Sequence, residues 1–281
     1  MDKKMLILIL LALLALFLVY KSFGLKRAYH AEVRNGFKQD ETAGYAVITE
    51  NDIKDLPAPV QKYLRYTGVI DKEKVKNFRV AGTGEFKTGP DKGWLKANFE
   101  QYSFIHQPRR IYFMKLSMFG LPVVGLHVYK DGKATMEIKA AGLLTVGEAK
   151  GEIMNKAETV TVFNDMCILA PASLVDKRIT WETINPFQVK ATFENNGIKI
   201  SADLFFNEKG ELINFVSQDR YMTTSGESFI NAPWSTPVRD YQDFNGIKIA
   251  SYGEAIWSLP EGDYCYGKIN ITEVKYNLPD D

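Results

Sequence analysis

The side chains that most often carry chemistry are few in this 281-residue chain, and their spacing fits no catalytic pattern. It has three histidines, His30, His106 and His127, and two cysteines, Cys167 and Cys265. The histidines are too scattered for a nucleophile–histidine–acid triad, and no Cys/His pair has the close spacing of a zinc site. We therefore predict structural histidines, no metal and no cofactor. We favour two buried thiols over a disulfide, although the sequence leaves the pairing open.

Acidic and basic residues on the predicted strands offer the remaining chemistry. Two carboxylates that meet across strands can act as an acid/base pair, and the candidates are Glu85, Glu100, Glu137 and Glu254. Arg109 and Arg110 could hold an anionic head group. Solvated strand faces and a surface turn account for these residues more simply. The sequence therefore favours a protein that is not an enzyme, with a hydrolase acting on a lipid or glycan as an alternative.

Aromatic and methionine side chains are the stronger signal. Most of the aromatic residues should form a core, but some could line a cavity with methionines, whose flexible thioethers suit varied apolar ligands. The residues that we predict for an apolar ligand site are Trp94, Tyr102, Phe104, Tyr112, Met114, Met118, Trp181 and Trp257.

The elements that must position these residues are mainly strands. Apolar and polar residues alternate from Val75 to Lys150 and again from Phe187 to Tyr276. Asp131-Gly132, Asn196-Gly197 and Asn245-Gly246 are typical hairpin turns, so each strand should run antiparallel to the last. We count roughly eleven to thirteen strands, and a sheet of that size curls. The predicted fold is mainly β with helical inserts (α+β): a large curled meander, or half-barrel, covered by two helical segments.

Two helical segments are the candidate covers of the concave face. Near residues 55–68, Pro57 can begin a helix, Val60 and Leu64 share its apolar side, and Gly68 can end it. Residues 151–175 form a helical insert that is apolar on most sides and is broken by Pro171. The insert is either an ordinary core helix or a lid over a hydrophobic groove.

The N-terminus reads as a membrane anchor. Residues 5–20 are an unbroken apolar run flanked by lysines, and as a helix they span roughly 24 Å, a little short of the hydrocarbon core of a bilayer. The exit has no small-x-small cleavage site. We predict a transmembrane signal anchor at 1–24, a polar, non-periodic juxtamembrane tether at 25–44 and a single β-rich domain at 45–281. Basic residues on both sides of the run leave the orientation open, and we expect an extracytoplasmic domain on a single-pass cell-membrane protein.

Three motifs carry a resemblance to known families. They are PVQKYLRYTG at residues 59–68, MFGLPVVG at 118–125 and PWSTP at 233–237, which is followed by NG at 245–246 and EAIW at 254–257. With them the chain resembles an uncharacterised bacterial family of membrane-associated proteins. The order of helix, meander, helical insert and meander is also similar to the lipoprotein-carrier fold of LolA, LolB and RseB. That resemblance implies a half-barrel that holds acyl chains.

The functional hypothesis combines these observations. The charge is balanced, with 35 Lys and Arg against 34 Asp and Glu, which argues against a nucleic-acid partner. We expect a membrane-anchored, non-catalytic module that binds a lipid, an acyl chain or another apolar molecule in a cavity of several hundred Å³ beneath the helices. The alternative is an envelope scaffold or sensor that binds another protein, for which we expect a filled core and an exposed apolar patch.

Overall fold

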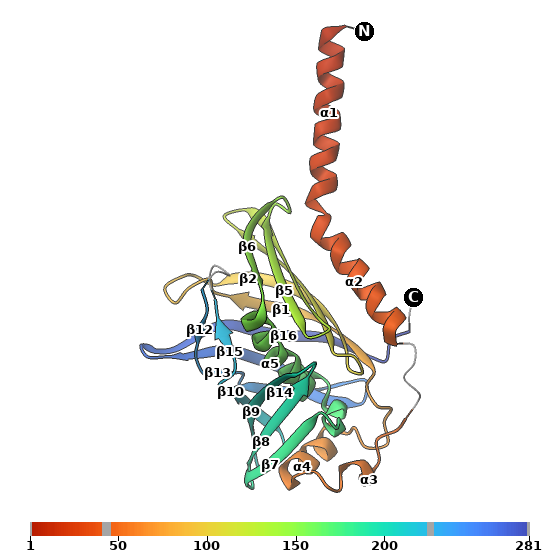
Figure 1. Ribbon diagram of the computed structural model, residues 1–281, viewed down its shortest axis with the longest axis vertical. Coiled ribbons are helices and arrows are strands. Elements are labelled where there is room, and N and C mark those ends of the chain that lie inside the picture. Colours follow the sequence, from red (N-terminus) through yellow and green to blue (C-terminus); the bar gives the residue numbers. More distant parts are fainter. Residues whose placement is uncertain (1, 41–45, 224–227, 280–281) are drawn as a thin grey trace.

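The computed structural model describes residues 2–40, 46–223 and 228–279, and its largest part is a curled antiparallel sheet. Figure 1 shows this sheet below a long N-terminal helix that stands away from it. The helices are α1 (Lys3–Ser22), α2 (Gly24–Asp40), α3 (Glu50–Ile53), α4 (Ala58–Thr67), α5 (Glu152–Leu169) and the 3₁₀ helix η1 (Pro171–Val175). The predicted fold class, mainly β with helical segments and an apolar N-terminal helix, is confirmed.

The strands fall into two series separated by α5. The first series is β1 (Asn77–Phe86), β2 (Leu95–Phe104), β3 (Arg109–Met118), β4 (Leu121–Lys130), β5 (Lys133–Ala140) and β6 (Leu144–Lys150). The second is β7 (Ile179–Asn185), β8 (Gln188–Asn195), β9 (Ile198–Phe206), β10 (Leu212–Ser217), β11 (Tyr221–Met222), β12 (Ile230–Asn231), β13 (Trp234–Ser235), β14 (Val238–Phe244), β15 (Ile247–Leu259) and β16 (Gly262–Tyr276). Three of these strands, β11 to β13, have only two residues each.

The sheet has the order β6-β5-β4-β3-β2-β1-β16-β15-β13-β10-β9-β8-β7, with β14 paired to β15. The predicted hairpin turns are present: Asp131 and Gly132 have φ of 52° and 71°, as a type I′ turn requires. The pairing of β1 with β16 shifts register between Ala81 and Gly82, so Gly82 lies at an irregularity of the β-bulge type.

Helix α5 must cross one face of the sheet because it connects β6 and β7, which are opposite edges. Its side chains are buried on nearly all sides. The Phe163 ring stacks on Phe193 with 5.2 Å between ring centroids, and the Tyr63 hydroxyl of α4 donates to the carbonyl of Cys167 at 2.8 Å. Of the two alternatives for the insert, the structure therefore shows a core helix.

Helix α2 corrects our interpretation of residues 25–44 as a non-periodic tether. Leu25, Tyr29, Val33 and Phe37 recur every four residues and are buried against the outer face of β2, β3 and β4. The partners of these four side chains are Phe104, Ile111, Phe113, Leu126 and Val128. We missed the helix because one apolar residue per turn is easily lost in a polar background; residues 41–45 of the predicted tether lie outside the described chain.

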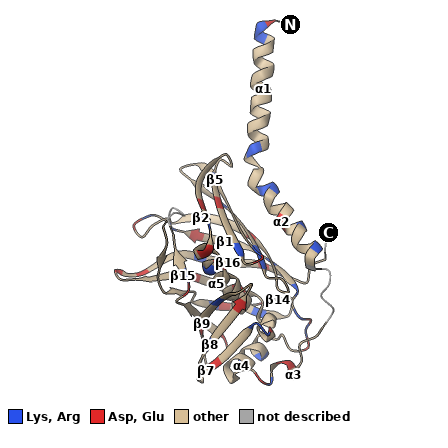
Figure 2. Ribbon diagram, in the orientation of Figure 1, with Lys and Arg blue, Asp and Glu red and all other residues tan. Residues whose placement is uncertain are grey.

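Helix α1 carries no buried side chain and is the helix of the described chain that is long and apolar enough to cross a membrane. Figure 2 shows its lysines only at its two ends. A single residue, Phe23, separates it from α2. The apolar helix and the packed domain are therefore joined by a very short connection.

Candidate functional site

The site lies on the inner, concave face of β1 to β6, which we call the α5 face, and the opposite side is the α2 face. Side chains alternate along β3, so Ile111 and Phe113 point to the α2 face, whereas Arg110, Tyr112 and Met114 point to the α5 face. Helix α5 covers only the half of this face that includes Arg110. The α5 face therefore has a covered base and an open upper half.

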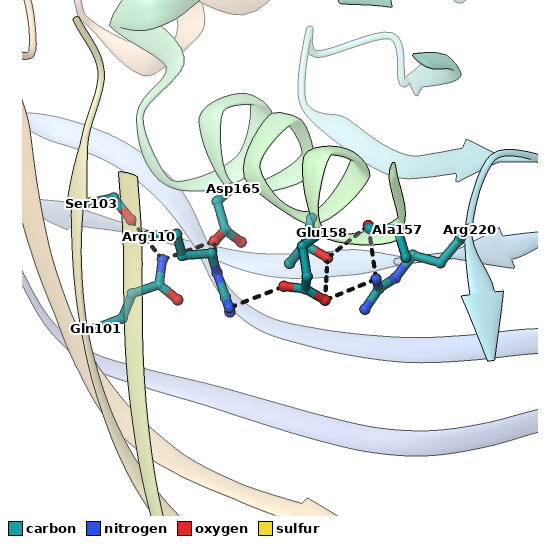
Figure 3. Close-up of polar contacts among 8 residues, drawn as sticks. Gln101, Ser103, Arg110, Ala157, Glu158, Asp165 and Arg220 are labelled. Atoms are coloured by element: carbon teal, nitrogen blue, oxygen red, sulfur yellow. Dashed lines mark hydrogen bonds and ion pairs between the residues drawn. The ribbon is translucent and has the colours of Figure 1, made fainter. Parts of the chain in front are cut away.

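At the base, four charged side chains form a buried ionic cluster, which Figure 3 shows in close-up. The Arg110 Nε donates to Asp165 Oδ2 at 2.7 Å, and its Nη1 lies 3.6 Å from Glu158 Oε2. The Arg220 Nη1 donates to Glu158 Oε1 at 3.0 Å and to the Ala157 carbonyl at 2.8 Å. Two cations and two anions thus balance one another between α5, β3 and the segment after β10.

Neutral side chains complete the ionic cluster. The Gln101 amide donates to Asp165 Oδ2 at 2.8 Å and to the Ser103 hydroxyl at 2.9 Å. The guanidinium of Arg110 lies over the Tyr112 ring at 4.8 Å, and that of Arg220 lies over the Trp234 ring at 4.7 Å. Buried charges need such partners because the protein interior solvates them poorly. The cluster therefore acts as a structural joint between α5 and the sheet.

The cluster also shifts the ionisation of its neighbours. Burial would raise the pKa of Glu158, but Arg220 and Arg110 outweigh it and lower that pKa to about 2. Burial raises the pKa of Asp165, which has only one of the two arginines beside it. Burial also lowers the pKa of His127 to about 4, so this imidazole is neutral at pH 7. A neutral His127 leaves the charge balance of the cluster intact.

Above the cluster, the α5 face carries half-buried apolar side chains that lie outside both hydrophobic cores or at the edge of the main one. Pairing places Met114 opposite Gly125, and Gly125 in turn opposite Ile138. Gly125 leaves the space between Met114 and Ile138 free of a side chain. We call the following residues the open strip: Met114, Leu116, Met118, Met136 and Ile138, of which only Met136 packs against the main core.

The space beneath α5 is filled, contrary to our expectation of an apolar cavity there. Within the described chain, the pocket between α5 and β1 to β3 has a volume of about 10 Å³, no more than one water molecule occupies. An open cleft of about 770 Å³ lies elsewhere, at the β1–β2 turn and the β15–β16 hairpin. Its lining is mixed and includes Lys87, Trp94, Glu254, Cys265 and Lys268, so it is not the expected apolar site.

Comparisons with known proteins place the chain in a family. Residues 46–269 match the model of a family of unknown function, DUF6544. The chain belongs to this family. A comparison with curated protein sequences finds no significant match for this DUF6544 protein.

Solved structures resemble the DUF6544 protein distantly. A DUF1329 family protein from Desulfovibrio piger is 10% identical, with 79% of this chain and 92% of that one covered and a TM-score of 0.45. A LolA superfamily protein from Nitrosomonas europaea is 10% identical, with 79% and 95% covered and a TM-score of 0.42. A domain from Vibrio parahaemolyticus, named "putative outer membrane lipoprotein-sorting protein", is 8% identical, with 72% and 86% covered and a TM-score of 0.42. The predicted resemblance to an uncharacterised family is confirmed by the DUF6544 match, and the similar solved structures include a LolA superfamily protein.

The DUF6544 structure separates the eight residues that we predicted for one site. Tyr112, Met114 and Met118 lie on the α5 face, at or near the open strip. Tyr102 and Phe104 lie on the α2 face against Phe37, so their packing is structural. The other three residues are dispersed: Trp94 lies between Lys87 and Lys268 in the mixed cleft, Trp181 lies on the edge strand β7, and Trp257 stacks on Tyr266 in the core.

Sequence reasoning missed most of the ionic cluster. It assigned Arg110 to a surface turn or a head-group site, whereas the residue is buried. Glu158 and Asp165 are seven residues apart, which places two carboxylates on one face of a largely buried helix. Because buried carboxylates need cationic partners, this spacing was the available signal.

Proposed function

We propose that this protein is a membrane-anchored, non-catalytic module that binds a lipid, an acyl chain or another apolar ligand on the open strip. The observation that carries the proposal is a row of half-buried apolar side chains beside two well-packed cores. A folded protein normally buries or disperses such side chains, so a contiguous set on a concave face is a binding surface. The ligand would lie along the strip rather than inside an enclosed cavity.

The composition of the open strip suits a ligand of variable shape. Three of its five residues are methionines, whose unbranched thioethers adapt to different apolar partners. Burying roughly 200 Å² of ligand surface would contribute about 5 kcal/mol at ~25 cal/mol per Å². The strip can therefore hold one acyl chain with modest affinity.

The ionic cluster supports a binding role over catalysis. Glu158 is held ionised between two arginines, and Asp165 is engaged by Arg110 and Gln101. A general acid or base needs access to its substrate, whereas these four charged side chains are nearly buried and are paired with one another. The cluster closes the base of the strip and sets how far a ligand can enter.

The membrane part of the proposal depends on α1. Its length and apolar composition suit a single-pass signal anchor, and its short connection to α2 would keep the domain at the membrane surface. We place the domain on the extracytoplasmic side, as expected for an uncleaved signal-derived anchor.

The proposal is tested by measuring bound lipid in the full chain purified from its host membrane. We expect native mass spectrometry and solvent extraction to recover a lipid or fatty acid from the unchanged protein. Ile138→Asp should reduce recovery about tenfold because a carboxylate would be buried against the ligand. The matched control is Ile184→Asp on β7, since Ile184 is exposed and distant from the strip. Absence of any bound lipid, or equal recovery from both variants, would contradict the proposal.

The filled space beneath α5 favours a second candidate, the protein-binding scaffold or sensor. This candidate expects the same concave face to receive an apolar segment of an envelope protein. Photo-crosslinking from Met114 in membranes separates the two ideas, because a lipid adduct supports the first and a protein adduct supports the second.

A further inference from the structure

Two neighbouring hairpin tips are unusually apolar. The β3–β4 tip, residues 116–126, and the β5–β6 tip, residues 140–147, contain no charged residue. The Phe119 side chain is 97% exposed and that of Leu144 is 68% exposed. The amide of Ala141 donates to the Pro122 carbonyl at 2.7 Å, so the two tips lie side by side. Together they form one exposed apolar surface, to which Leu121, Leu143 and Val146 also contribute.

Two other hairpins of the same sheet show that this composition is not required for a turn, although the β7–β8 tip, residues 183–189, is also free of charged residues. The β4–β5 turn contains Lys130, Asp131 and Lys133, and the β15–β16 turn contains Glu261 and Asp263. These turns carry the charge that keeps a soluble surface hydrated. The two apolar tips therefore differ from these charged turns, and their composition suits an apolar environment rather than water.

The apolar tips lie beside the end of α1. A side-chain carbon at Gly142 would clash with the Ser22 carbonyl oxygen, so the β5–β6 tip touches the last residue of α1. Figure 1 shows the top of β5 and β6 level with the junction of α1 and α2. Tyr20 and Phe23 are exposed there, and the Arg27 guanidinium lies 3.8 Å from the centre of the Tyr20 ring. Aromatic and basic side chains of this kind gather at the membrane–water interface.

The short apolar run of α1 favours a position of the α1–α2 junction close to the acyl chains of the bilayer. The apolar run of α1 spans roughly 24 Å, against a hydrocarbon core of about 30 Å. A span that is too short is accommodated by thinning the bilayer or by pulling its flanks inward. The level of Ser22 and Gly142 then falls at the boundary between head groups and acyl chains.

We propose that the β3–β4 and β5–β6 tips insert into the same leaflet in which α1 ends, as a second membrane contact. The open strip ends at Met118 beside Leu121, so insertion would open the strip directly to the acyl chains. The occupant of this surface is a lipid bilayer rather than a protein because the tips continue the apolar surface of α1. The proposal rests on the membrane anchor of the proposed function, and it adds how the domain is oriented.

Labelling the full chain in phosphatidylcholine–phosphatidylglycerol vesicles tests the insertion. An environment-sensitive dye is attached to Phe119→Cys or Leu144→Cys in a Cys265→Ser background, because Cys167 is buried and unreactive. We expect blue-shifted emission and about threefold stronger quenching by doxyl-labelled lipid than at the control, Ile184→Cys on β7. A label on Leu10→Cys within α1 reports on the anchor separately.

The outcomes distinguish the two ideas. Quenching at positions 119 and 10 together supports insertion beside the anchor, whereas a label at position 10 that remains in water overturns the anchor and, with it, the shared leaflet. A label at 119 that resembles the Ile184→Cys control, with position 10 quenched, overturns insertion alone. A label at 119 that is shielded from soluble iodide but not quenched by lipid indicates a protein contact and also overturns insertion.

Discussion

The two faces of the β1 to β6 half of the sheet are built on different principles. The α2 face is sealed mainly by apolar packing of α2 on Phe104, Ile111 and Phe113, and its one buried charge within the described chain, Arg109, pairs with Glu32 of α2. The α5 face is held at its base by four buried charges and is left half-open above them. Apolar packing is tolerant of small shifts, whereas paired buried charges fix one arrangement. The contrast indicates that the position of α5 is specified closely where the open strip begins.

The largest effect should come from breaking the ionic cluster. Arg110→Ala leaves Glu158 and Asp165 in a buried site with fewer cations, which should cost about 3–5 kcal/mol in the free energy of unfolding. Urea titration of the full chain in detergent measures this loss. The control is Arg79→Ala on the α2 face, whose partners Glu100 and Glu273 are about one-third exposed, so about 1 kcal/mol is expected. Equal losses in the two variants would contradict the distinction between the faces.

A smaller effect should come from the apolar packing of the α2 face. Phe104→Ala removes a buried ring that packs on Phe37 and lies directly against Gly36, so about 3 kcal/mol should be lost. Met114→Ala, on the opposite face, should cost only about 1 kcal/mol because its side chain is half-buried. The same urea titration compares them. If Met114→Ala is the more damaging, the open strip is part of the core and not a binding surface.

The smallest effect is the pH dependence of His127. Burial lowers the pKa of His127 from 6.5 to about 4 in the folded protein. Between these two pH values, the unfolded chain binds a proton at His127 that the folded chain does not bind. Stability should therefore fall as pH decreases from about 6.5 towards 4, by on the order of 2 kcal/mol for this partly exposed group. Melting temperatures between about pH 7 and 5 stay above the main carboxylate range. We expect His127→Gln to flatten this slope, and an unchanged slope would assign it to other groups.

Much of the fold could be predicted because its signals are local. Period-two alternation and turns such as Asp131-Gly132 depend on neighbouring residues, and they specify strands and hairpins correctly. Helix α2 was missed because its apolar side, with Tyr29 and Phe37, is recognisable only when its partner surface on β3 and β4 is known. The order of the strands, in which β1 pairs with β16, is likewise a long-range property.

The candidate site was less predictable than the fold. Residue type suggested Tyr102 and Tyr112 for one site, but the alternation of strands places them on opposite faces. The ionic cluster joins Arg110, Glu158 and Arg220 from segments far apart in the chain. Periodicity assigns a side chain to one face of its own strand, and it does not show which face receives a helix.

The short connection at Phe23 limits where the protein can work. Because α2 is packed along the sheet, it cannot unfold into a flexible linker without losing the contacts of Tyr29 and Phe37. With α1 in the bilayer, the domain could not travel between two membranes in the way that a soluble shuttle does. A bound ligand would have to be exchanged at the membrane that holds α1. The exchange partner would be a molecule that diffuses laterally to the domain, or an acceptor that binds to the domain there.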